Sequence, residues 1–109
     1  CITGDGGLQM NIQELETINH YQLPIKIFLI NNEGYGIIKQ TIDTWLDSRY
    51  VGTDSKSGLG FPDFKKVANA YNIAAQEILS HENLNEKIQE ALNFEGPLLI
   101  DVRVKLLVA

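Results

Sequence analysis

Apolar positions along the chain follow two spacings, one typical of helices and one typical of buried strands. Leu8, Ile12 and Leu15 recur at intervals of three and four residues with polar residues between them, which predicts an amphipathic helix over residues 8–21. Residues 25–30 then form a nearly continuous apolar run rich in β-branched side chains, as in a strand that is covered on both faces. We therefore expect the first third of the chain to be a helix followed by a strand.

The same two spacings alternate through the rest of the chain. Asp63 and Asn83 stand where helix N-caps are expected, and Asn72 stands where the first of these helices should stop. The further elements expected are helices over 35–46, 63–71 and 83–92, strands over 74–79 and 98–104, and a long surface loop over 47–61. This alternation predicts an α/β fold, a parallel sheet flanked by helices on both sides.

The start of the sequence suggests where the chain belongs. Cys1, Ile2 and Thr3 come directly before a glycine-rich turn and are typical of the last residues of a strand. We therefore expect residues 1–109 to form a single, partial domain of a longer polypeptide.

Composition and charge narrow the range of partners. Hydrophobic residues make up 44 % of the chain and charged residues 21 %, which is enough apolar material for a packed core. The net charge is −5 and the basic residues are scattered, so nucleic acid is not an expected partner. The apolar runs are far shorter than the roughly 20 residues that span a bilayer, so no membrane association is expected. A single cysteine and no Cys/His cluster predict no internal disulfide and no zinc site, which favours a cytoplasmic location.

The glycine-rich turn is the first candidate for chemistry. Gly4, Asp5, Gly6 and Gly7 join a strand end to a helix start, where free backbone N–H groups favour an anion such as phosphate. The Asp5 carboxylate would repel a phosphate unless a divalent cation lay between them, so Asp5 is a candidate metal ligand. A plain strand-to-helix turn with Asp5 as the helix N-cap is the alternative.

A second turn follows the strand expected over 25–30. If that strand runs parallel to the first, the turn over 31–34 emerges at the same edge of the sheet, where α/β proteins bind ligands. The Asn32 amide oxygen and the Gly34 carbonyl would suit a hard cation that takes its other ligands from phosphate and water. Between Gly6 and Asn32 lie 25 residues.

The two turns together resemble the thiamine diphosphate motif of the pyruvate decarboxylase and acetolactate synthase superfamily. That motif has Gly-Asp-Gly, a similar interval and then paired asparagines, which here are Asn31 and Asn32. The segments that carry the resemblance are 4–15, 23–26, 31–36, 61–64, 70–71 and 96–97. The resemblance covers nearly the whole chain and implies a partial thiamine-diphosphate-binding fold.

The resemblance also implies roles for these residues. The cofactor-binding set that it implies is Gly4, Asp5, Gly6, Gly7, Asn32, Gly34 and Tyr35. Within this set, Asp5, Asn32 and the Gly34 carbonyl would hold Mg²⁺ on the diphosphate of the cofactor. The N–H groups of Gly6 and Gly7 would contact phosphate. The glutamate that activates the cofactor in this family lies on a separate domain, usually of the partner subunit, and nothing in this chain matches it, so no catalytic residue is assigned.

The reaction implied is the decarboxylation of a 2-oxo acid such as pyruvate and transfer of the activated aldehyde to an acceptor, in a homodimer or homotetramer. Ile38 stands where pyruvate decarboxylases carry a glutamate, which favours acetolactate synthase-like transfer over simple release of an aldehyde. Thr41 follows Gln40 where acetolactate synthases have a tryptophan, which points to a different acceptor. A non-catalytic α/β binding module that keeps the fold without the cofactor is the alternative function.

Aromatic residues near the long loop, and the two histidines, have simpler expected roles. We expect Trp45 and Tyr50 to pack against a neighbour or against a domain outside this chain rather than to line a substrate channel. His20 and His81 are expected at the surface.

Overall fold

A four-stranded parallel sheet forms the centre of the molecule. The computed structural model describes residues 1–105 of the 109-residue chain. The strands are β1 (Ile2–Gly4), β2 (Lys26–Asn31), β3 (Ala74–Ile78) and β4 (Leu98–Arg103), and their order across the sheet is β1-β2-β4-β3. Every neighbouring pair is parallel, so the carboxyl ends of all four strands lie at one edge.

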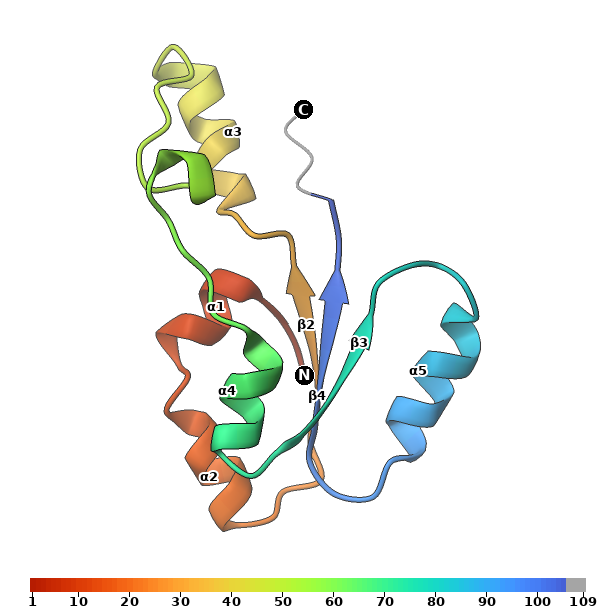
Figure 1. Ribbon diagram of the computed structural model, residues 1–109. Coiled ribbons are helices and arrows are strands. Elements are labelled where there is room, and N and C mark those ends of the chain that lie inside the picture. The colour runs from red at the N-terminus through yellow and green to blue at the C-terminus, as the bar shows by residue number, and fades with distance from the viewer. Residues whose placement is uncertain (106–109) are drawn as a thin grey trace.

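Helices cover both faces of this sheet. They are α1 (Asp5–Met10), α2 (Glu14–His20), α3 (Gly36–Trp45), α4 (Phe64–Ala70) and α5 (Leu84–Asn93), with the short 3₁₀ helix η1 (Ser55–Ser57). Helices α1, α2 and α4 lie on one face and α5 on the other, whereas α3 projects beyond the carboxyl ends of the strands (Figure 1). The predicted α/β fold is confirmed. Within residues 1–105, no helix combines the length and the apolar character needed to cross a membrane.

Two apolar cores lie on opposite faces of the sheet. Strand β4 belongs to both, because its alternate side chains point to opposite faces. Leu99 packs in the core with α1, α2 and α4, whereas Leu98 and Ile100 pack on the side of α5. Burial on both faces of the sheet explains why the central strands have nearly continuous apolar sequences. Ile30, near the end of β2, is an exception because its side chain is exposed.

The helix expected over 8–21 is wrong in its boundaries. The first helix begins at Asp5, inside the glycine-rich turn, and a turn at residues 11–13 separates α1 from α2. The predicted apolar stripe still faces the core, since Leu8 and Leu15 are buried and Ile12 packs against them. Burial of the stripe therefore does not require one continuous helix, and the turn lets two short helices reach the same core.

The expected capping residues of α4 are confirmed, whereas the expected N-cap of α5 is confirmed only in its position. The Asp63 carboxylate accepts hydrogen bonds from the amides of Lys65 and Lys66 at 3.0 and 3.2 Å, which caps α4. Asn72 follows this helix with a positive φ of 58°, as expected of a helix stop. Asn83 occupies the N-cap position of α5, but its side chain makes no capping hydrogen bond.

Truncation of Leu99 tests the importance of the core beneath α1, α2 and α4. The Leu99 side chain is 0 % exposed, so Leu99→Ala is expected to lower the free energy of unfolding by about 2–5 kcal/mol through lost burial and a residual cavity. Leu79→Ala removes the same atoms from a side chain that is 64 % exposed, and should change stability by no more than about 0.5 kcal/mol. Urea denaturation of both variants measures the difference. Equal losses would contradict the assignment of Leu99 to the core.

Candidate functional site

The two candidate turns meet at the carboxyl edge of the sheet. Strands β1 and β2 are neighbours, with Gly4 paired with Ile30, so each turn begins beside the other. Asp5 is only 3 % exposed, and its carboxylate accepts hydrogen bonds from the backbone amides of Gly6 at 2.7 Å and Asn32 at 3.1 Å. The second of these bonds joins the two turns directly.

The helix boundary bears on the alternative interpretation of Asp5 as a helix N-cap, while its role as a metal ligand stays a prediction. Gly4 occupies the N-cap position of α1, and Asp5 is the first residue of the helix. The Asp5 carboxylate therefore does not cap the helix from outside, as the alternative interpretation required. It accepts one hydrogen bond from Gly6 in its own helix and one from Asn32 in the neighbouring turn.

The second turn is built from its own side chains. The Asn32 side-chain oxygen accepts a hydrogen bond from the Gly34 amide at 3.1 Å, and the Asn31 side-chain oxygen accepts one from the Glu33 amide at 3.3 Å. Such bonds, in which the backbone N–H two residues later donates to an asparagine side-chain oxygen, stabilise tight turns. Glu33 adopts a positive φ of 54° within this turn. The Asn32 and Gly34 oxygens are thus set by the sequence of the turn itself.

A cleft of about 720 Å³ opens between these turns and the start of α3. Its lining includes the whole predicted set, Gly4, Asp5, Gly6, Gly7, Asn32, Gly34 and Tyr35. The remaining lining residues are mostly apolar, and they are Met10, Ile30, Gly36, Ile37, Ile38 and Gln40. The cleft therefore combines a polar floor at the two turns with an apolar wall. The binding role of each residue stays a prediction.

The Tyr35 ring closes one side of the cleft and lies against Gly6. A Cβ atom added at Gly6 would lie 2.4 Å from Cε1 of Tyr35, which is closer than any van der Waals contact. The ring of Phe61 meets the Tyr35 ring edge-on, with 6.1 Å between their centres. Glycine at position 6 is therefore required for the tyrosine to occupy this place.

The donors available at the cleft fit a cation that is shared with a ligand. No cluster of three or more His, Cys, Asp or Glu side chains that could hold a metal occurs within the described part of the chain. The cleft offers one carboxylate from Asp5, one amide oxygen from Asn32 and the backbone carbonyl of Gly34. Mg²⁺ is usually bound by one or two carboxylates together with phosphate oxygens and water, and this donor set suits that mode of binding.

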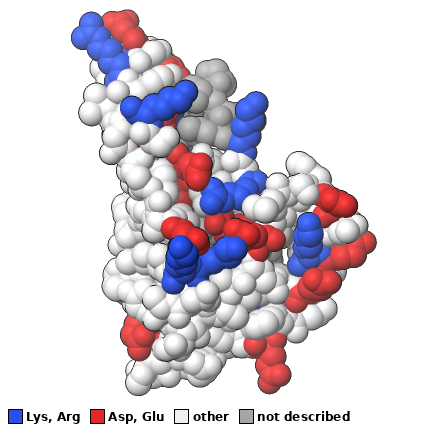
Figure 2. Space-filling view, in the orientation of Figure 1, with Lys and Arg blue, Asp and Glu red and all other residues white. Residues whose placement is uncertain are grey.

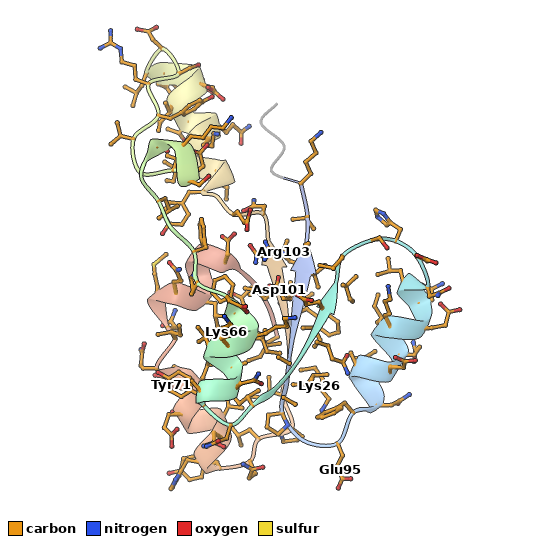
Figure 3. The ribbon with its side chains drawn as sticks, viewed as in Figure 1. Lys26, Lys66, Tyr71, Glu95, Asp101 and Arg103 are labelled. Atoms are coloured by element: carbon orange, nitrogen blue, oxygen red, sulfur yellow. The ribbon has the colours of Figure 1, made fainter. Side chains whose placement is uncertain are left out.

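Strand β4 contributes support that the sequence analysis missed. The Asp101 carboxylate, 2 % exposed, accepts two hydrogen bonds from the Asn31 side-chain amide at 3.0 and 3.2 Å. Arg103 lies close by at the carboxyl end of the strand and forms a salt bridge with Glu33 at 2.6 Å (Figure 3). Burial raises the pKa of the Asp101 carboxyl. The signal was present in the sequence, because Asp101 interrupts the apolar run of Leu98, Leu99, Ile100 and Val102.

The two aromatic residues near the long loop, Trp45 and Tyr50, differ in how far they are buried. Trp45 is 77 % exposed within the described part of the chain, so its expected packing against a neighbour or against another domain stays a prediction. Tyr50 is half-buried, donates a hydrogen bond from its hydroxyl to Asp43, and lies beneath the Lys39 ammonium. His20 and His81 are exposed, as expected.

Charged side chains of both signs lie next to each other across one face of the molecule. Figure 2 shows acidic and basic groups mixed in its centre, with no single broad basic patch on that face. Among the described residues, the salt bridges of this kind include Lys65 with Glu77 at 2.7 Å and Arg103 with Glu33.

A parallel α/β sheet with two turns converging on a donor-lined cleft at its carboxyl edge is typical of ligand-binding α/β domains. Comparison with known families makes the class specific: residues 1–102 match the family described as "Thiamine pyrophosphate enzyme, C-terminal TPP binding domain". The chain belongs to this family of thiamine-diphosphate-binding domains, which confirms the resemblance and the cofactor inferred from the sequence.

Curated relatives of the chain are acetolactate synthase large subunits. The subunit from Cyanidium caldarium is 45 % identical over 101 residues, which are 93 % of this chain and 17 % of that protein. Those from Pyropia yezoensis and Haemophilus influenzae are 42 % identical over 104 residues and 39 % identical over 106 residues, and each match covers 95 % of this chain. The chain spans only 17 % and 18 % of the length of these two relatives.

Alanine at two of the three glycines of the first turn, Gly6 and Gly4, separates a tight position from an open one. Gly6→Ala should displace the Tyr35 ring, because the new methyl group would overlap it. Gly4→Ala adds the same methyl group where no atom lies within 4 Å, at an ordinary φ of −83°. NMR spectra of the aromatic side chains should show shifted Tyr35 and Phe61 signals only in Gly6→Ala. Unchanged Tyr35 signals in that variant would show that the ring does not lie against Gly6.

Proposed function

We propose that this chain anchors thiamine diphosphate through Mg²⁺ in an acetolactate synthase-like enzyme. Such an enzyme would decarboxylate a 2-oxo acid such as pyruvate and transfer the resulting activated aldehyde to an acceptor. The observation that carries this proposal is the meeting of both turns in one cleft, with the buried Asp5 carboxylate hydrogen-bonded across to the amide of Asn32.

The proposed anchor uses oxygen atoms that still have free lone pairs. Each oxygen of the Asp5 carboxylate accepts one backbone hydrogen bond, and a carboxylate oxygen can take a second partner. Asp5, Asn32 and the carbonyl of Gly34 would thus hold Mg²⁺ against the diphosphate. The Gly6 amide already donates to Asp5, so the Gly7 amide is the better placed of the two to meet a phosphate oxygen.

The cofactor supplies the carbanion chemistry when it is bound, and the protein positions it and shapes the space around it. In this chain the apolar wall of the cleft would do the shaping. Ile38 lines that wall. With an isoleucine rather than a carboxylic acid there, this chain offers no proton donor from position 38, which supports transfer to an acceptor over release of an aldehyde.

The remaining features of the whole enzyme follow from the same proposal. We infer that the activating glutamate comes from another domain, that the enzyme works as a homodimer or homotetramer, and that it is cytoplasmic. A non-catalytic binding module with the same fold is the competing function, and the experiments below distinguish it.

The 109-residue chain alone should release no CO₂ from pyruvate when thiamine diphosphate and Mg²⁺ are added, because no activating glutamate is assigned to it. A chimera in which the chain replaces the matching segment of the Cyanidium caldarium acetolactate synthase large subunit should release CO₂ in a cofactor-dependent way. Release of labelled CO₂ from pyruvate, against a no-protein control, measures both. An inert chimera that folds but does not bind the cofactor would favour the non-catalytic module.

Neutralising the Asp5 carboxylate of the first turn, with Glu33 of the second turn as the control, tests the metal site in that chimera. Asp5→Asn keeps the size of the side chain but removes a charge from the proposed ligand, and should weaken thiamine diphosphate binding at fixed Mg²⁺ by at least about 10- to 100-fold, the loss that even outer-sphere changes produce. Glu33→Gln is the matched control, because Glu33 pairs with Arg103 and does not line this cleft. Fluorescence titration gives both affinities. Normal binding by Asp5→Asn together with a large loss in Glu33→Gln would show that the proposed site is wrong.

A further inference from the structure

A nearly buried ion pair joins α3 to the loop that follows it. The Lys39 ammonium lies 2.5 Å from the Asp54 carboxylate, and the two side chains are only 9 % and 15 % exposed. The hydrogen bond between them lowers the pKa of Asp54 to about 2 and raises the pKa of Lys39. Both groups are therefore charged at neutral pH. Neither residue has a role in the site as described so far.

Asp54 is connected to the edge of the cleft through the backbone. It forms an isolated antiparallel β-bridge with Gly34, and the Tyr35 amide donates a hydrogen bond to the carbonyl of Thr53 at 2.8 Å. On its other side, the Asp54 carboxylate accepts hydrogen bonds from the amide and the hydroxyl of Ser57 at 3.0 and 2.9 Å. The Asp54 carboxylate is thus held by η1, while the backbone of Thr53 and Asp54 holds the second turn.

Lys39 reaches the same edge of the cleft from the other direction. Its amide donates to the carbonyl of Tyr35 at 2.9 Å, which places Lys39 one helical turn after the tyrosine. Its ammonium group also lies 4.4 Å from the centre of the Tyr50 ring. Since α3 projects away from the sheet in Figure 1, these polar contacts hold the helix in a place where the apolar cores do not reach.

We propose that Lys39 and Asp54 are positioning residues, whose pairing holds Gly34 and Tyr35 in the arrangement that the cofactor site needs. This inference rests on the proposed function, since it gives the ion pair a purpose at the proposed anchor. The pair closes a loop that starts at Gly34, runs through α3 and returns at Asp54. Opening it would release both the Gly34 carbonyl and the Tyr35 ring that lies against Gly6.

The first test measures the positioning itself, without any cofactor. Lys39→Met removes the charge and keeps the length of the side chain, so hydrogen exchange of the Tyr35 amide in the 109-residue chain should accelerate about tenfold or more as its bond to Thr53 opens. Amides in the middle of β2, such as that of Leu29, report whether the fold is intact. Lys65→Met is the matched control, because it breaks the Lys65–Glu77 pair away from the cleft. Asp54→Asn, which keeps the acceptor for Ser57, provides a second variant if Lys39→Met does not fold.

The second test measures the consequence for the site in the chimera described above. Lys39→Met should weaken thiamine diphosphate binding about 10-fold, Lys39→Arg should restore most of the loss, and Lys65→Met should have no effect. Wild-type exchange of the Tyr35 amide in both Lys39→Met and Asp54→Asn would overturn the positioning role, whatever the cofactor does. Faster exchange with unchanged affinity would show that the pair holds the loop but does not serve the site. A wild-type chimera that binds no cofactor would refute the proposed function, while the exchange measurement still judges the ion pair separately.

Discussion

The hydrogen bond from the backbone amide of Asn32 to the Asp5 carboxylate is the contact on which the geometry of the site depends. It is possible only because β1 and β2 are neighbours and parallel, so that both strands end at the same edge. A shift of one residue in their pairing would move the Asp5 side chain away from Asn32, since successive side chains point to opposite faces. The apolar core beneath α1, α2 and α4 maintains that register through Leu8, Ile27 and Leu29. Packing of apolar side chains thus determines the distance between two polar turns.

The two consecutive asparagines of the second turn are held from opposite sides by two buried carboxylates. Asp5, after β1, accepts from the backbone of Asn32, and Asp101, on β4, accepts from the side chain of Asn31. A buried carboxylate is unfavourable unless hydrogen bonds replace the water that it loses, and each of these two has such partners. The structure therefore tolerates negative charge in its interior at the place where a cation would bind. Asp101 shows the cost directly, because burial is the largest influence on its raised pKa.

Much of this arrangement could be predicted from the sequence, because it depends on short-range patterns. The apolar runs located β2 and β4 to within one residue, and the parallel pairing of β1 with β2 followed from the alternation of elements. The break between α1 and α2 was missed because the apolar stripe continues across it. The pair formed by Lys39 and Asp54 was missed for a different reason: it depends on how a loop without apolar periodicity folds back, and spacing gives no sign of that. Asp101 was overlooked, although its place among the apolar residues of β4 was visible in the sequence.

The two sides of the cleft are held in different ways, and this difference has a consequence. The Asp5 and Asn32 part of the polar floor is held by the hydrogen bond between the two turns and by β2, whose Ile27 and Leu29 side chains are buried in one core, so it opens only when the sheet itself loses structure. Much of the apolar wall belongs to α3, whose Ile37 side chain is exposed and whose place is maintained by an ion pair and by backbone bonds of the returning loop, which also hold Gly34. Local opening needs less free energy where few apolar contacts are lost. The side chains of the α3 wall can therefore change while Asp5 and Asn32 keep their geometry, whereas a shift of α3 itself would also move Gly34. A division of this kind allows one anchor for the cofactor to be combined with different shapes of substrate pocket.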